Sequence, residues 1–385
     1  MIDLVEEYWT LELIEHLYEH ESGVVPDDFR DAFHQRFNRR GQLLLTGSAR
    51  HALTVLLVHA ARGSSKRRVL LSSFNCRVVK EAVVNSGLAV ETFDFATDNG
   101  RIDWQAVGEI LRGDHLAVVV PHFFGIPTDF GGILSATRRK NVLIIEDCAH
   151  ALGASISGTL AGQMGDAAIF SFNYDKPISL AGGGALLINN SALQIDKKTV
   201  EAMPARRDEL HQFRQMASVL RYRRKRRDQG RLMARVGAKL HALPRLPTGI
   251  GVLRAAVGVW QLERYNEIRK RRDRNAQLLQ QSLRHLSWHV AGNVDPSYLK
   301  LRMIIDPTDA AAAVRQCQEC GITAANSNWP ALIEGKEDAG PRVHAFHAAT
   351  FGLEVPVHQN LSSAHIAQIT SAFASARAPA GMGGL

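Results

Sequence analysis

Two side chains of this sequence suit covalent cofactor chemistry, an acid and a lysine that lie 29 residues apart (176 − 147). Asp147 ends the apolar run NVLIIED, and Lys176 follows a second apolar run, AAIFSF. Three consecutive glycines, 182–184, come shortly after the lysine. An amine held near apolar strands, beside glycines that let a flat ligand approach the backbone, is what Schiff-base chemistry with an aldehyde cofactor requires. The stretch 146–188 is therefore the first candidate for a catalytic site.

A second candidate is the turn formed by Gly47, Ser48 and Ala49, within LLLTGSARHALTVLLVHAA, residues 43–61. This segment predicts a strand, a tight turn and a helix. Backbone N–H groups at the helix start, together with the Ser48 hydroxyl, would form an anion site suited to a phosphate. The alternative is an ordinary strand-to-helix turn.

The elements that must position these residues alternate along the chain. Strand-like runs begin at about 42, 68, 88, 116, 141, 167 and 184, mostly with helical stretches between them. This alternation predicts an α/β fold with a mostly parallel, seven-stranded sheet covered by helices on both faces. Ligands of such sheets bind at the carboxyl ends of the strands. Since Ser48, Cys76, Asp147 and Ser171 all fall at predicted strand ends, we expect them to converge.

The rest of the chain predicts a second, smaller domain. Residues 1–245 would hold the N-terminal helices and the large domain, 250–378 a long linker helix and a small α+β domain, and 379–385 a disordered tail. In the small domain LKLRMIID, AAAAVRQCQECGI and ITAANSNWP predict strand, helix and strand. Cys317 and Cys320 form a lone CxxC inside that helix, so we expect ordinary helix positions and no metal site.

The composition is that of a soluble globular protein, with 385 residues of which 45% are hydrophobic and 22% charged. The start, MIDLVEEYW, carries acids where a signal peptide needs positive charge, and no apolar run approaches the length of a membrane span. We therefore expect a cytoplasmic protein. Its four cysteines are expected to be reduced thiols.

The net charge of +8 comes from one segment. Residues 206–245 hold 13 Lys or Arg and three acids, an excess of 10, so the rest of the chain is slightly acidic at −2. Within it RYRRKRR, 221–227, has six basic residues out of seven. The run could bind an anionic substrate, an acidic membrane face or nucleic acid, or it could be a solvated helix. We expect no nucleic-acid partner, and contact with a membrane surface stays open.

The stretch 146–188 resembles the signature of the DegT/StrS family of sugar aminotransferases, fold-type-I pyridoxal-phosphate (PLP) enzymes of the aspartate aminotransferase superfamily. The resemblance continues in weaker form from about residue 12 to about residue 375. The residues that carry it are Glu146, Asp147, Ala149, His150, Ala151, Leu152, Gly153, Gly165, Asp166, Ser171, Phe172 and Lys176. A linker helix is matched as well, through Ala255, Ala256, Gly258, Gln261, Leu262 and Glu263.

The resemblance implies a role for each matched site residue. Lys176 would form the imine with the cofactor and then shuttle a proton, and Asp147 would keep the ring nitrogen protonated. His150 would contact the phenolic oxygen or the face of the ring. Ser171, with Gly47, Ser48 and Ala49, would hold the phosphate.

Three departures from the family pattern concern ligand contacts. Cys76 stands at the position of the residue that stacks on the ring, with Phe74 as an alternative for that role. The sequence RLPTGI replaces a motif whose Asn and Arg reach the neighbouring subunit's active site, which leaves Arg245 as a candidate replacement. Asn328 and Trp329 stand where the family commonly has His-Tyr.

The resemblance implies an aminotransferase that moves an amino group, usually from glutamate, to a keto sugar in amino-sugar, polysaccharide or natural-product biosynthesis. The typical acceptor is nucleotide-linked, and a homodimer with composite active sites is the expected assembly. Two alternatives stay open: a PLP enzyme acting on a keto cyclitol or other ketone, or catalysing dehydration or deamination, and a non-catalytic PLP-fold protein that binds an anionic partner through its basic segment.

Overall fold

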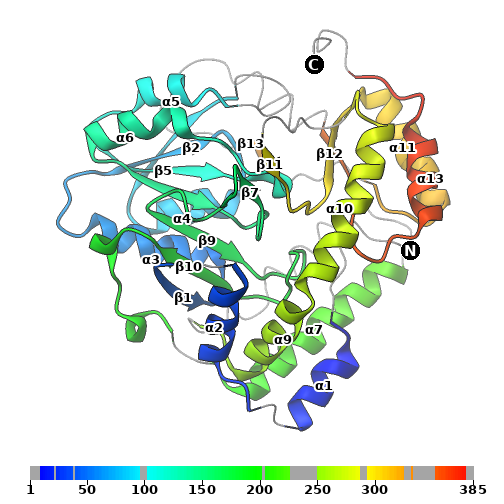
Figure 1. The fold of residues 1–385 in the computed structure, drawn as a ribbon, viewed down its shortest axis with the longest axis horizontal. Helices are drawn as coiled ribbons and strands as arrows, with labels where there is room; N and C mark the ends of the chain where they lie inside the picture. Colours follow the sequence, from blue (N-terminus) through cyan, green and yellow to red (C-terminus); the bar gives the residue numbers. More distant parts are fainter. Residues whose placement is uncertain are drawn as a thin grey trace.

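The computed structural model describes residues 9–20, 23–37, 40–95, 102–201, 204–225, 249–286, 293–324, 331–332 and 352–378. Its main sheet has seven strands in the order β1-β10-β9-β6-β5-β2-β4, which confirms the predicted α/β fold (Figure 1). In chain order the strands are β1 (Gln42–Thr46), β2 (Arg68–Ser72), β4 (Ala89–Phe93), β5 (His115–Pro121), β6 (Leu143–Asp147), β9 (Ala167–Ser171) and β10 (Gly184–Ile188).

The strands of this sheet share one direction, except for β10. Strands β9, β6, β5, β2 and β4 are parallel to one another, whereas β10 runs antiparallel to its two neighbours, β9 and β1. The carboxyl ends of six strands therefore meet at the edge where β10 begins. The turns that leave those ends carry the predicted site.

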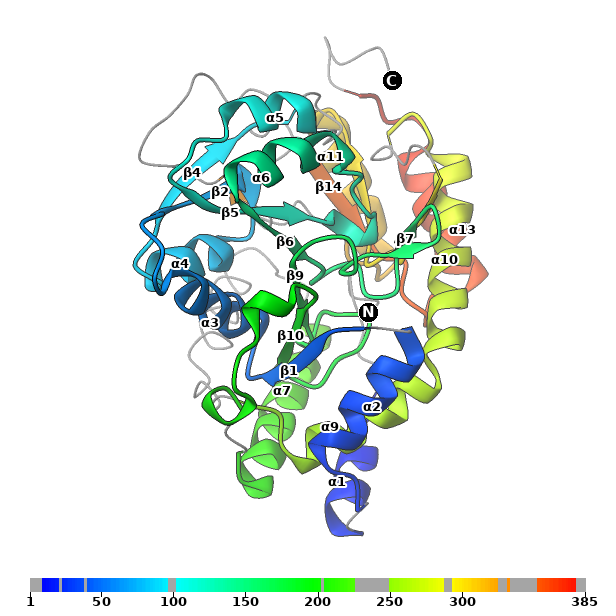
Figure 2. The same ribbon diagram turned by 60° about the vertical axis from the view of Figure 1, so that its left-hand side comes forward.

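Helices cover both faces, because side chains alternate along each strand. Val69 and Leu71 face a core with α3 (Ala49–Ala61) and α4 (Arg77–Asn85), while Leu70 faces α5 (Trp104–Ile110) and α6 (Leu134–Lys140) (Figures 1 and 2). The second face is completed by helices at the β1 side of the sheet, which are α1 (Leu11–Glu19), α2 (Pro26–Phe37), α7 (Arg206–Lys225) and α9 (Val252–Glu263).

A separate core gathers residues from 276 to 376. It is built by α10 (Tyr265–Ser282), α11 (Pro307–Glu319), α13 (Ser363–Phe373) and the antiparallel pair β12 (Leu301–Ile304) and β14 (Gly352–Val355). This is an α+β unit of the predicted kind. The exact division at 245–250 stays a prediction, because 226–248 lies outside the described residues.

The predicted strand at 322–330 lies outside the described residues from 325 onward. Residues 322–324 do not begin a regular strand, and the strand paired with β12 is β14. The reason is the end of α11, where Gly321 adopts φ +75° and the Ile322 N–H donates to the Cys317 carbonyl at 2.9 Å. Cys317 lies within α11 and Cys320 caps it, as expected for ordinary helix positions. No described helix has both the length and the apolar character needed to cross a bilayer.

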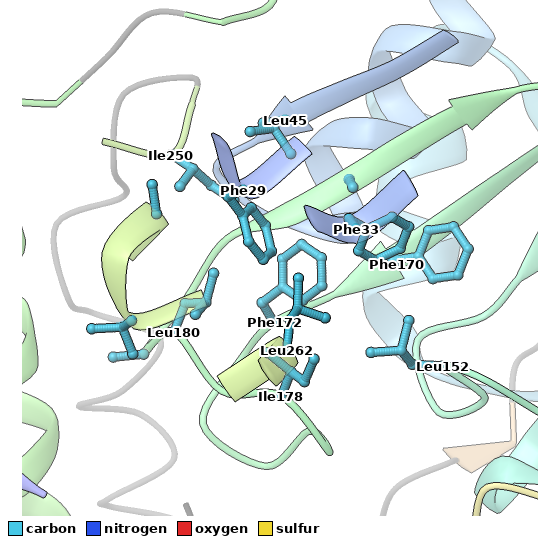
Figure 3. Close-up of a cluster of buried hydrophobic side chains, with 14 of the residues drawn as sticks. Phe29, Phe33, Leu45, Leu152, Phe170, Phe172, Ile178, Leu180, Ile250 and Leu262 are labelled. Carbon is cyan, nitrogen blue, oxygen red and sulfur yellow. The ribbon is translucent and has the colours of Figure 1, made fainter. Parts of the chain in front are cut away.

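Helix α9 packs on α2 at Gly258, next to a cluster of aromatic rings. Phe29 and Phe33 of α2 meet Phe172 with ring centroids 5.4 and 6.2 Å apart, in edge-to-face contacts (Figure 3). A Cβ on Gly258 of α9 would lie 2.5 Å from two ring carbons of Phe29. The absence of a side chain at 258 thus lets α9 approach the ring.

We predict that Gly258→Ala lowers the free energy of unfolding by up to about 2 kcal/mol. Overpacking costs roughly 1–3 kcal/mol, and the gain in helix propensity recovers about 1 kcal/mol. Urea unfolding followed by circular dichroism measures the change. Gly113→Ala is the control, since a Cβ there meets nothing within 4 Å and we expect a change within about 0.5 kcal/mol. Equal effects of the two substitutions would contradict the packing argument.

Candidate active site

The predicted site residues converge at one edge of the sheet. Thr46, Gly184 and Ser171 lie side by side across β1, β10 and β9. Strand β6 comes next and ends in Asp147, which is in register with Pro121 of β5. The structure therefore brings Ser48, Asp147, Ser171 and the segment that holds Lys176 to the same edge.

The turn 47–49 packs directly on the glycines that follow Lys176. The Gly183 N–H donates to the Gly47 carbonyl at 3.0 Å, and a Cβ on Gly184 would lie 2.5 Å from the Ser48 carbonyl carbon. Ser48 caps α3, because its Oγ accepts from the His51 N–H at 3.1 Å. A hydroxyl that accepts a hydrogen bond still has its O–H to donate. The turn 47–49, called the cradle below, thus offers a helix N-terminus and a hydroxyl group to an anion.

Lys176 is buried, with 4% of its surface exposed, and its Nζ donates to Asp175 Oδ2 at 3.1 Å. Burial acts to raise the pKa of Asp175, but the charges of Lys176 and Lys300 outweigh it and hold that pKa below the ordinary value. Asp175 is therefore an ionised partner of Lys176. An acid directly before the candidate lysine is the sequence signal that would have identified this partner.

Asp147 lies at the end of β6, where Oδ1 accepts from the Ala149 N–H at 3.0 Å. Burial raises the pKa of Asp147, although that hydrogen bond and the charges of Lys176 and His122 oppose the rise. A cation placed beside this carboxyl would lower its pKa again and keep it ionised. The site is thus prepared for a positively charged partner at Asp147.

His150 is held as a neutral imidazole. Its pKa lies well below the ordinary value because the ring is buried, and the charges of Lys176 and Lys300 lower it further. Its Nδ1 accepts from the Phe124 N–H at 3.2 Å, so the ring proton is on Nε2. Phe124, in the turn η1 (Phe123–Gly125), adopts φ 57° to make this contact. His150 can therefore donate from Nε2 within the site.

Glu146, one residue before Asp147, is a structural residue. Its two oxygens accept from His122 Nε2 at 3.0 Å and from the N–H groups of Gly162, Met164 and Gly165 at 2.7–2.8 Å. Among the described residues, His122, Glu146 and Cys148 also form a group with metal-capable atoms within 4.8 Å of one another. Since the carboxylate already has four donors, this group is a hydrogen-bond network and gives no support for a metal site.

Helix α9 holds the loop that follows Lys176 through two buried side chains. Arg254 donates to the carbonyls of Leu180 and Ala181 at 2.8 and 3.2 Å. Gln261 binds both the N–H and the carbonyl of Ser179, at 3.1 and 2.8 Å. Burial lowers the pKa of Arg254 to about 10, against the opposing charge of Glu209, so the guanidinium stays charged at neutral pH. The matched linker helix therefore fixes the active-site loop.

The stacking residue stays a prediction. Cys76 caps α4 and is half-buried, with its backbone N–H bonded to Asn75 Oδ1 at 2.7 Å. Phe74, in β3 (Phe74–Asn75), is fully buried among Phe95, Phe123 and Phe124. Its ring is therefore covered by neighbouring side chains, which leaves Cys76 as the better candidate of the two.

Several predicted residues cannot be placed. Arg245, Asn328 and Trp329 lie outside the described residues. In the basic run, 221–225 belong to α7 and the remainder is not described. Their roles stay predictions.

We predict that Glu146→Gln destabilises the protein by about 1–3 kcal/mol, since an amide keeps one acceptor oxygen and turns an NH₂ group toward N–H donors. Urea unfolding at several pH values measures this. Burial acts to raise the pKa of Glu146, but His122 and the backbone N–H groups outweigh it and lower that pKa below 4.5. The carboxylate's contribution is therefore complete above about pH 4.5 and is lost as the pH falls through the lowered value.

The difference between parent and variant should shrink accordingly in acid. Glu263→Gln is the control, because this carboxylate is largely exposed in its ion pair with Arg264, and we expect a change within about 0.5 kcal/mol. A Glu146 variant as stable as the parent at pH 7 would show that the four donors contribute nothing.

The sequence matches the model of the DegT/DnrJ/EryC1/StrS aminotransferase family over residues 19–374. Among characterised relatives, a putative L-glutamine:3-amino-2,3-dideoxy-scyllo-inosose aminotransferase of Micromonospora echinospora is 29% identical over 272 residues, which are 68% of this chain and 57% of the relative. A UDP-4-amino-4,6-dideoxy-N-acetyl-beta-L-altrosamine transaminase of Campylobacter jejuni is 29% identical over 44% of this chain and 45% of its own length. The chain thus spans about half the length of these relatives.

Solved structures share the fold over nearly the whole chain. A sugar aminotransferase of Micromonospora echinospora has a TM-score of 0.73 at 17% identity, covering 97% of this chain and 100% of that one. The aminotransferase of pseudaminic acid biosynthesis from Helicobacter pylori has a TM-score of 0.73 at 16% identity, covering 96% and 97%. The match of the family model over residues 19–374 shows that the chain belongs to the DegT/DnrJ/EryC1/StrS aminotransferase family.

Proposed function

We propose that this protein is a PLP-dependent aminotransferase that transfers an amino group from an amino acid to a keto sugar. The observation that carries the proposal is the convergence of Lys176, Asp147 and His150 with the 47–49 cradle at one edge of the sheet. Membership of the aminotransferase family supports it. Lys176 stands where some family members have a histidine and catalyse dehydration, so its presence favours transamination.

The residues present fit pyridoxal phosphate. The cradle at 47–49 packs on the backbone of 183–184 without an intervening side chain and offers N–H and O–H donors to a phosphate. Asp147, whose pKa burial raises, gains a counter-charge when a protonated ring nitrogen lies beside it. Lys176 is buried between the two. A donor set of amine, carboxyl, neutral imidazole and anion cradle matches the functional groups of this cofactor.

When bound, pyridoxal phosphate supplies an aldehyde and a ring that accepts electrons. Lys176 would hold the cofactor covalently, and its Nζ would carry a proton between the two carbons that gain and lose it. Asp175, 3.1 Å from that Nζ, orients the amine. Asp147 would hold a proton on the ring nitrogen, and His150 would donate from Nε2. Ser48, Ser171 and the start of α3 would bind the phosphate.

The acceptor is proposed from the relatives' names, and the donor from the resemblance to the family. One relative acts on a keto cyclitol derivative and another on a UDP-linked sugar. We propose a nucleotide-linked keto sugar as the acceptor, with a keto cyclitol as the alternative, and glutamate as the donor. We also propose a cytoplasmic homodimer. Contact of the basic segment with an anionic surface stays a prediction.

We predict that Lys176→Ala keeps the fold but loses covalent attachment of PLP and all amino transfer, because the amine that forms the bond is gone. Three measurements check this: circular dichroism, the absorbance of the PLP-loaded protein, and borohydride reduction with mass analysis of the peptide that contains residue 176. Transfer from glutamate to a panel of keto sugars is assayed in parallel. Lys197→Ala, at an exposed ion pair with Asp27, is the control with unchanged activity. Amino transfer by the Lys176 variant would refute the assignment.

We predict that Asp147→Asn binds PLP but transfers the amino group roughly ten- to a thousandfold more slowly. A nearby opposite charge shifts a pKa by about 1–3 units, and the ring nitrogen would lose that stabilisation. Single-turnover kinetics with glutamate measure the effect. Asp103→Asn is the matched control, since Asn caps α5 as Asp103 does. A rate within a few-fold of the parent would remove Asp147 from the mechanism.

A further inference from the structure

A cluster of three buried charges lies at the start of the small-domain strand pair. Lys300 and Arg302 alternate with Leu301 and Met303, and Arg302 is opposite Glu354 in the register of β12 and β14. Lys300 Nζ donates to Glu354 Oε2, and Arg302 Nη1 donates to Oε1 at 3.0 Å. Their exposed fractions are 6%, 1% and 0%. Two cations thus share this carboxylate.

Arg302 is built into this arrangement. Its guanidinium carbon lies 5.6 and 5.5 Å from the ring centroids of Phe74 and Phe124, both of the large domain. A Cβ on Gly352 would overlap the guanidinium. Arg302 is therefore held by cation–π contacts and by the space that Gly352 leaves beside its guanidinium. Its hydrogen bond to Glu354 holds that carboxylate in place. Glu354 then orients the Lys300 amine.

A short chain of contacts ties Lys300 to the candidate active site. The Phe124 N–H donates to His150 Nδ1, and the Phe124 carbonyl accepts from the Leu299 N–H at 2.9 Å. Lys300 is the next residue. Its charge acts on both sides of the site, because it lowers the pKa of His150 and that of Asp175. Lys300 therefore lies close to the candidate site, next to the segment that contacts Phe124.

An amino-acid donor has a carboxylate on the carbon that carries its amino group. That amino group must replace the Lys176 amine, so the carboxylate comes to rest close to Lys176. A carboxylate taken from water into a buried site requires a cation and hydrogen bonds. Lys176 itself is used by the reaction. Among the described residues, Lys300 is the other lysine whose charge acts on both His150 and Asp175.

We propose that Lys300 binds the carboxylate on the amino-bearing carbon of the amino donor. The inference rests on the proposed function and names the residue that selects an amino acid as donor. Because Glu354 divides its charge between Lys300 and Arg302, Lys300 keeps part of its attraction for an incoming anion.

The test compares the PLP-loaded parent and Lys300→Met in spectral titrations with two amines. Glutamate has the carboxylate in question, and 4-aminobutyrate is the same molecule without it. We expect the apparent dissociation constant for glutamate to rise roughly ten- to a hundredfold in the variant, the effect of one charge-assisted hydrogen bond. We expect the constant for 4-aminobutyrate to change less than threefold. Lys300→Arg should recover part of the glutamate affinity.

The variant is expected to fold, since Glu354 retains Arg302 as a partner. Lys66→Met is the control: Lys66 is a half-buried lysine that is bonded to the Lys140 carbonyl at 2.6 Å, and it lies in the loop before β2. The constants of this control should equal those of the parent. An unchanged glutamate constant in Lys300→Met overturns the inference. Equal weakening of both amines overturns it too, because Lys300 would then bind the distal carboxylate.

Calorimetric titration with glutarate separates this inference from the proposed function. If the parent reacts with no amino acid, yet binds glutarate and loses at least tenfold in affinity on Lys300→Met, the anion site stands and the aminotransferase proposal fails. If an unreactive parent binds glutarate with the same affinity as the variant, or not at all, the anion site fails as well.

Discussion

The carboxylate of Glu146 holds together the edge of the sheet on which the candidate site is built. It joins the end of β5, through His122, to the backbone of residues 162–165, which lead into β9. Side chains of consecutive strand residues point to opposite faces. Glu146 is therefore turned into this network, and Asp147 is turned away from it toward the site. A carboxylate with four donors is costly to move, so the position of Asp147 is fixed by a neighbour that does no chemistry.

The lysine side of the site is positioned from another direction. The loop 178–184 carries three residues with positive φ in succession before β10, which are Ala181, Gly182 and Gly183, and it has little regular structure of its own. The loop's backbone groups are instead bonded by Arg254 and Gln261, which form hydrogen bonds with two of its carbonyls and one N–H. Glu209 of α7 in turn accepts from the Gly251 and Leu253 N–H groups at the start of α9, both at 2.9 Å. Lys176 therefore depends on residues nearly 80 positions downstream.

The sequence predicts the fold and much of the site for identifiable reasons. All seven strands of the main sheet are marked by compact apolar runs, and parallel strands with helical connections have few arrangements. Asp147 and Ser171 lie within or at the end of such runs, so their strand-end positions could be predicted, and Lys176 comes four residues after the second run. Lys300, Arg302 and Glu354 could not, because a strand with alternating charges normally predicts a solvent-facing side. Only the register of β12 with β14, formed across about 50 residues, turns those charges inward to one another. Residues 322–324 do not begin the predicted strand for a local reason, the hydrogen bond from the Ile322 N–H to the end of α11.

The largest hydrophobic core draws on three distant parts of the chain: residues 9–45, the segment 148–217 and residues 250–265. The contact between Phe29 and Gly258 joins its first and last parts. During synthesis α2 can pack on the sheet region through Phe33 with Phe170 and through Phe29 with Phe172, but the side of the Phe29 ring that faces Gly258 is covered only when α9 has been made. More than 200 residues are made in the interval. This part of the core is therefore completed late, together with the hydrogen bonds from α9 that hold the loop after Lys176.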